Sequence, residues 1–132
     1  EIKGYSIRTD TDLTYEAALE KVTELLKEQG FGVLTEIDVS ATLKKKIDVD
    51  FPRYKILGAC NPKLAYQTLQ AETEIGLLLP CNVIVYEKED GGVAVAAMNP
   101  GEAMSVVKND SIAPIAGQVT EKLQTVISGL DG

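Results

Sequence analysis

Two cysteines, Cys60 and Cys81, are the side chains of this sequence best suited to chemistry. Each adjoins a strongly hydrophobic run, and each is followed by an asparagine, Asn61 or Asn82. A thiolate can exchange with a disulfide or bind a soft metal ion, so the pair could support a redox or a metal-handling function. If Asn61 opens a helix, the helix dipole and its free N–H groups would favour the thiolate.

A structural role for the two cysteines is the main alternative. Cys60 alternates with Tyr54 and Ile56 along one strand, and Cys81 alternates with two valines along another, so both thiols could be small buried hydrophobic groups. Metal binding would need further ligands, because zinc prefers four and no Cys-x-x-Cys spacing is present. Structural, redox and metal-binding interpretations therefore remain open.

The composition excludes several common kinds of site. Because the chain has no histidine, Ser-His-Asp catalysis, Cys-His catalysis and the histidine zinc motifs are absent. Gly91-Gly92 is better explained by a hairpin turn than by a phosphate-binding loop. A net charge of −7 argues against nucleic acid as a partner, and the basic run at 44–46 has no interleaved aromatic residues. We therefore favour a protein that is not an enzyme.

Hydrophobic periodicity predicts the elements that must position the cysteines. Thr14, Ser40 and Asn61 are expected to cap helices. In chain order, the sequence predicts a strand over 2–9, a helix over 14–29, a strand over 31–39, a short helix over 41–47, a strand over 54–60, a helix over 62–72, strands over 81–88 and 93–98, and a helix from about 110 to 128.

This order predicts an α+β fold in one domain over residues 1–132, with a mainly antiparallel sheet and two long helices on one face. Two short helices are inserted after the second and third strands. Antiparallel pairing of 54–60 with 81–88 would bring Cys60 and Cys81 to one end of the sheet, on matching inward positions and with their Cα atoms close enough for a common site. Glu74 would lie near that end and is a further candidate for ligand binding.

Three motifs resemble those of the domain of unknown function 302 family. They are residues 30–34 (GFGVL), 56–62 (ILGACNP) and 76–83 (GLLLPCNV), and they occur in the family's order over most of the chain. The resemblance implies a small bacterial or archaeal protein with a β-α-β(4)-α core like that of the TATA-binding-protein fold, with extra helices and a homodimeric state. It implies no function, because a shared fold does not supply one.

Together these observations favour a small binding or assembly domain that forms a homodimer and holds a small ligand or a partner. The apolar run at 77–79 is one that a small monomer would not readily bury alone. No stretch approaches the roughly 20 apolar residues of a membrane span, and no signal-peptide pattern is present, so we expect a cytoplasmic protein without a membrane partner. The alternative is a thiol-dependent redox or metal-handling protein that uses Cys60 and Cys81. No cofactor is assigned, and the candidates for ligand binding are Cys60, Asn61, Glu74, Cys81 and Asn82.

Overall fold

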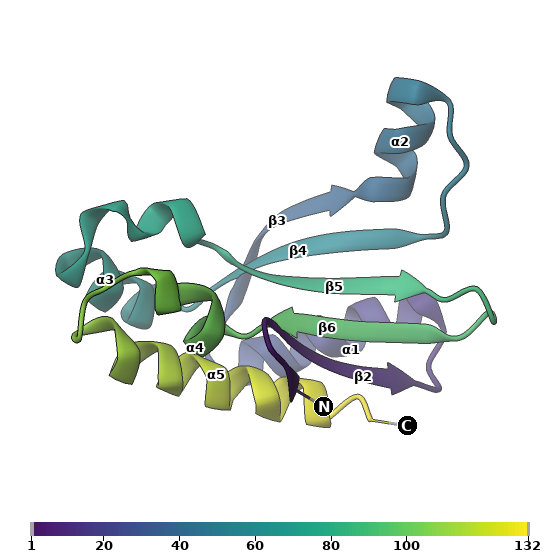
Figure 1. Cartoon of the computed structure of the whole chain (residues 1–132). Coiled ribbons are helices and arrows are strands. Elements are labelled where there is room, and N and C mark those ends of the chain that lie inside the picture. The colour runs from purple at the N-terminus through teal and green to yellow at the C-terminus, as the bar shows by residue number, and fades with distance from the viewer. Residues whose placement is uncertain (1, 132) are drawn as a thin grey trace.

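The computed structural model describes residues 2–131, which form a six-stranded sheet with long helices on one face (Figure 1). Within these residues, no helix has the length and apolar composition needed to cross a membrane. In chain order the elements are β1 (Ile2–Lys3), β2 (Ser6–Thr11), α1 (Tyr15–Glu28), β3 (Gly32–Asp38), α2 (Val39–Ile47), β4 (Tyr54–Cys60), α3 (Pro62–Ala71), the 3₁₀ helix η1 (Thr73–Leu78), β5 (Cys81–Glu87), β6 (Val93–Met98), α4 (Pro100–Ala103), the 3₁₀ helix η2 (Met104–Val106) and α5 (Ile112–Ser128).

Neighbouring strands run antiparallel in the order β1-β2-β6-β5-β4-β3. Helix α1 packs against β5 and β6, α5 packs against β2 and β6, and the two helices contact each other. Ala18, Val22 and Leu26 recur every four residues along α1 and are fully buried, as expected for a helix with one apolar stripe. The predicted α+β fold, with a mainly antiparallel sheet covered by two long helices, is confirmed.

Local signals fix most element ends where the sequence predicts them. The Thr14 hydroxyl accepts a hydrogen bond from the Ala17 N–H (3.1 Å) and so caps α1. Gly30, with a φ of 85°, stops the same helix, and Gly91, with a φ of 87°, turns the chain between β5 and β6. Strand β6 matches its predicted range of 93–98.

The N-terminal strand differs from expectation. A single strand is predicted over 2–9, but the chain reverses at Gly4, where φ is 51°, and β1 pairs back onto β2. Glycine permits this reversal because it has no Cβ. Strand β2 then continues to Thr11, through residues predicted as a turn, because it pairs with β6 along its whole length and places Thr11 opposite Val93.

Strand β3 and helix α2 also differ from expectation. The register between β3 and β4 shifts between Val33 and Thr35, so the alternation is interrupted and no residue of β3 is buried. Helix α2 begins where β3 ends, and Asp38 rather than Ser40 caps it, accepting a hydrogen bond from the Ala41 N–H (2.9 Å). The predicted position of this short helix at an edge, outside the core, agrees with the structure, since none of its residues is buried.

Three short helical segments, η1, α4 and η2, fall where the sequence predicts no regular structure. They bury Ile75 and Met104 against Ile112 and Ala116 of α5, which makes a second, smaller apolar cluster beside the main core. Their lengths of three to six residues explain why periodicity does not reveal them.

Gly58 allows three segments to approach closely near the cysteine end of the sheet. A Cβ added at this position would lie 2.8 Å from Pro80 Cγ and closer still to Thr35 Oγ1. Thr35 belongs to β3, and Pro80 precedes β5 and follows a cis peptide bond with Leu79. The packing of β3 and β5 on either side of β4 therefore requires glycine here.

Candidate functional site

Strands β4 and β5 pair antiparallel and bring Cys60 and Cys81 to the same end of the sheet, as predicted. Both cysteines line a cavity of about 30 Å³, which is room for roughly one or two water-sized groups. The cavity lies among the ends of these strands, α3 and α5. Its walls are almost entirely apolar and include Phe31, Ala59, Leu64, Leu79, Met104 and Val119.

The two cysteines do not occupy matching inward positions. The register places Ala59, not Cys60, opposite Cys81, so the pleat puts Cys60 on the other side of β4. Tyr54 and Ile56 share that side, which faces away from α1 and α5. Cys60 still borders the cavity because it is the last residue of β4, where the chain leaves the sheet for α3. The expected inward position is therefore wrong for Cys60, and the separation of the two Cα atoms stays a prediction.

The surroundings of Cys81 favour its neutral thiol. Its side chain is only 6% exposed. Burial raises its pKa to about 11, and the neighbouring Cys60 acts in the same direction. Cys60 is half-buried, and both residues are free thiols. A buried neutral thiol is a poor nucleophile at neutral pH, so these surroundings support a structural role for Cys81 more than a redox role.

A metal site at the cysteines would lack ligands within one chain. Over residues 2–131, no three side chains of the ligating types (Cys, His, Asp or Glu) gather where they could hold a metal ion. The cavity itself offers only Cys60 and Cys81 from these types. Because a structural zinc site takes four protein ligands, two more would have to come from another molecule.

The other three predicted site residues lie apart from one another. Asn61 lines the cavity, but its amide is already engaged: Oδ1 accepts a hydrogen bond from the Leu64 N–H (3.3 Å) and caps α3, while Nδ2 donates to the Gln29 carbonyl (3.3 Å). Asn82 is exposed on the face of the sheet away from α1 and α5, and Glu74 is exposed in η1. Neither of these two lines the cavity. Of the five candidates, only the two cysteines and Asn61 come together.

The face of the sheet opposite α1 and α5, here called the open face, is a second candidate surface, and the sequence motifs did not point to it. The register aligns one row of side chains across it: Ile37, Ile56, Ile84, Ala96 and Arg8. Such a face usually carries polar side chains, whereas four of these five are apolar. The sequence does contain a signal for this apolar face. Strand β6 reads Val-Ala-Val-Ala-Ala-Met, so the residues on both of its sides are apolar.

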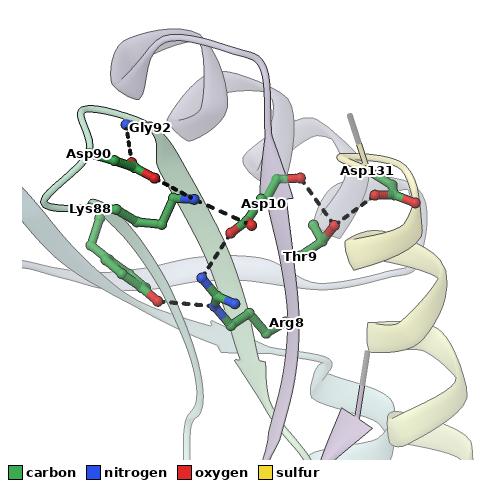
Figure 2. Close-up of polar contacts among 8 residues, drawn as sticks. Arg8, Thr9, Asp10, Lys88, Asp90, Gly92 and Asp131 are labelled. Carbon is green, nitrogen blue, oxygen red and sulfur yellow. Dashed lines mark hydrogen bonds and ion pairs between the residues drawn. The ribbon is translucent and has the colours of Figure 1, made fainter.

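Larger side chains frame the alanines of β6 on the open face. The rings of Tyr54 and Tyr86 stack with centroids 5.5 Å apart. Arg8 Nε donates a hydrogen bond to Tyr86 Oη (3.1 Å) from β2 to β5, across the intervening β6, and Figure 2 shows this contact beside the ion pair of Arg8 with Asp10 (2.8 Å). Ala94, opposite Tyr86, is consequently inaccessible to solvent although it faces away from α1 and α5.

Comparison with known proteins agrees with this fold. The family model described as Domain of unknown function DUF302 matches residues 6–130, which is nearly the whole chain. The chain belongs to the DUF302 family. A crystal structure of an uncharacterized conserved DUF302 protein from Bacillus stearothermophilus is 26% identical, with a TM-score of 0.90 over 97% of this chain and 99% of that one. An uncharacterized protein of Aquifex aeolicus (strain VF5) is 38% identical over 48 residues, 36% of this chain and 33% of its own length. That match therefore spans about a third of the relative, and DUF302 membership, inferred from the three motifs, is confirmed.

Proposed function

We propose that this DUF302 protein is a non-catalytic binding or assembly domain that works as a homodimer. The observation that supports this proposal is the segment over residues 32–53, here called the arm, which comprises β3, α2 and the loop before β4. Neither β3 nor α2 has a buried residue. Among residues 2–131 twelve large hydrophobic side chains are exposed, and five of them belong to the arm, namely Leu34, Ile37, Ile47, Val49 and Phe51. Apolar surface gathered in this way is typical of a protein contact.

The position of the arm fits an interface. Figure 1 shows α2 at the far end of β3, near the edge of the sheet that β3 forms and away from α5 and β2 at the other edge. Ile37 is 49% exposed and Ile47 is 63% exposed, so burying either side chain in an interface would remove substantial apolar area from water. Burial of such area stabilises an assembly by about 25 cal/mol per Å² before the costs of association. Ile37 also begins the apolar row of the open face, so the arm and that face are continuous.

The leucine run at 77–79 gives weaker support than the sequence suggests. Leu78 and Leu79 pack against the second apolar cluster, so they already serve the fold. Leu77 remains 85% exposed but stands alone in η1. It is therefore better suited as a control position than as the centre of an interface.

The cavity beside Cys60 and Cys81 is where this domain would hold a small ligand. Its volume of about 30 Å³ and its apolar walls restrict an occupant to a short apolar group unless the walls move. A thiol-dependent function is the second candidate, because the two cysteines share this cavity. The raised pKa of Cys81 counts against it.

Sedimentation equilibrium from low to high micromolar concentration tests the homodimer. The wild-type chain should dimerise, Ile47→Asp in the arm should weaken the dimer, and Leu77→Asp outside the arm should leave it unchanged. A wild-type chain that stays monomeric at high micromolar concentration would overturn the proposal. If Ile84→Asp on the open face dissociates the dimer while Ile47→Asp does not, the assembly stands and the arm is the wrong surface.

A further inference from the structure

A groove beside α1 carries an excess of negative charge. It has a volume of about 580 Å³, carboxylates at four-residue spacing along α1 and an apolar floor. Glu16 is paired with Arg53, and Glu36 is paired with Lys55 (2.6 Å). Over residues 2–131, Glu20 and Glu24 have no ion-pair partner, and at this spacing they repel each other. The residues that line the groove include Glu16, Glu20, Glu24, Glu36, Leu19 and Leu57.

Helix α2 carries the complementary charge, and its own chain covers it only in part, where it contacts β3 and β4. It has nine residues, none of them buried, and isolated helices shorter than about 12 to 15 residues are marginal in water. Val39, Leu43 and Ile47 recur every four residues and form one apolar stripe along it. Its last turn contains three lysines at 44–46, the only basic run of the sequence. A surface that is both apolar and acidic would complement this helix.

The lysines of α2 are only partly neutralised within one chain. Lys44 is held by Asp48 (3.0 Å) and Asp50 (3.2 Å). Lys45 and Lys46 are exposed and have no ion-pair partner in the described part of the chain. Since the α1 carboxylates and these lysines do not meet within one copy, their pairing requires a second molecule.

We infer that, in the homodimer proposed above, α2 of each copy lies in the acidic groove of the other, with Lys45 and Lys46 beside Glu20 and Glu24. The inference rests on that proposed dimer and assigns its surfaces. Helix α2 follows β3 directly, and Glu36 of β3 borders the groove, so donor and acceptor surfaces are neighbours in one chain. A single two-fold axis near β3 would then satisfy both contacts at once, as in an isologous interface.

Two charge-reversed variants test the pairing by complementation. Lys45→Glu with Lys46→Glu, and separately Glu20→Lys with Glu24→Lys, should each raise the dimer dissociation constant by about tenfold or more, since like charges then face each other. An equimolar mixture of the two variants should recover a dimer. In that heterodimer one contact has wild-type charges, and the other has both signs reversed.

Matched controls carry the same change of charge on exposed positions elsewhere. Lys63→Glu with Lys108→Glu, and Glu89→Lys with Glu102→Lys, should leave the dissociation constant within about twofold, because scattered surface charges contribute little. Circular dichroism establishes that each variant is folded before sedimentation. Higher salt should weaken the dimer because it screens the ion pairs. All measurements are therefore made at one ionic strength.

A cross-link on the wild-type chain keeps the inference testable if a variant does not fold. A carbodiimide joins a lysine directly to a touching carboxylate, and a mixture of isotope-labelled and unlabelled chains identifies links between copies. Links from Lys45 or Lys46 to Glu20 or Glu24 are expected. The pairing is overturned, and the homodimer stands, if the wild-type chain dimerises but the mixture of variants does not. The same conclusion follows if the cross-links of the wild-type dimer join other residues. A monomeric wild-type chain overturns both.

Discussion

At neutral pH, the thiol of Cys81 should react with an alkylating reagent at least about a hundredfold more slowly than an unstructured cysteine. Burial, reinforced by Cys60, raises its pKa from 9.0 to about 11. A shift of this size lowers the fraction of thiolate, the reactive form, by about a hundredfold. Because the side chain is also only 6% exposed, restricted access lowers the rate further.

The assay uses Cys60→Ser, which leaves Cys81 as the single thiol. Alkylation by iodoacetamide is followed by mass spectrometry in the native protein and, as the reference, in the same variant unfolded in urea. Between pH 9 and pH 10 the unfolded thiol should approach its limiting rate, whereas the native rate should still rise because the native thiol is still titrating. Native labelling as fast as the reference at pH 7, or a native rate that levels off below pH 9, would refute the reasoning and favour the thiol-dependent function.

Three further predictions concern residues near the cysteine end of the sheet, and each is measured by urea unfolding. Gly58→Ala should destabilise the protein by about 1–3 kcal/mol through overpacking, whereas Gly117→Ala, in α5 with nothing within 4 Å of the added Cβ, should stabilise it by about 0.5–1 kcal/mol. Asn61→Ala should cost about 1–2 kcal/mol, since it loses the α3 cap and the hydrogen bond to the Gln29 carbonyl just after α1, while the exposed Asn82→Ala should change stability by less than about 0.5 kcal/mol. Relative to Cys81→Ala, the wild-type chain should lose about 1.3 kcal/mol of stability from pH 8 to pH 10, because the unfolded thiol ionises near pH 9.0 while the native thiol stays protonated up to about 11. A Gly58→Ala variant as stable as wild type, equal effects at the two asparagines, or parallel pH curves would each contradict the corresponding argument.

The sequence by itself determines the elements whose limits depend on local chemistry. Thr14 and Asn61 provide the helix caps that their positions predict, because an N-cap acts over only three residues. The apolar periodicity of α1 and the glycine turn at Gly91 act over similarly short distances. The same reasoning predicts the antiparallel α+β class, and the hairpin of β5 and β6 follows from its turn.

The tertiary structure alone decides how the strands lie against one another. Alternation shows which residues of one strand share a side, but the register between strands depends on pairing over long separations in sequence. A shift of one residue exchanges the two faces, and for this reason Cys60 could not be assigned to its face in advance. The bulge between Val33 and Thr35 exposes β3 in the same way.

The open face and the acidic groove also depend on long-range packing. The row from Ile37 to Arg8 draws one residue from each of five strands, so it exists only once their order and register are fixed. The groove joins carboxylates of α1 to Glu36 of β3, which the fold alone places side by side. Local sequence sets the charge and polarity of each segment, and the packing of the sheet against its helices decides which segments meet.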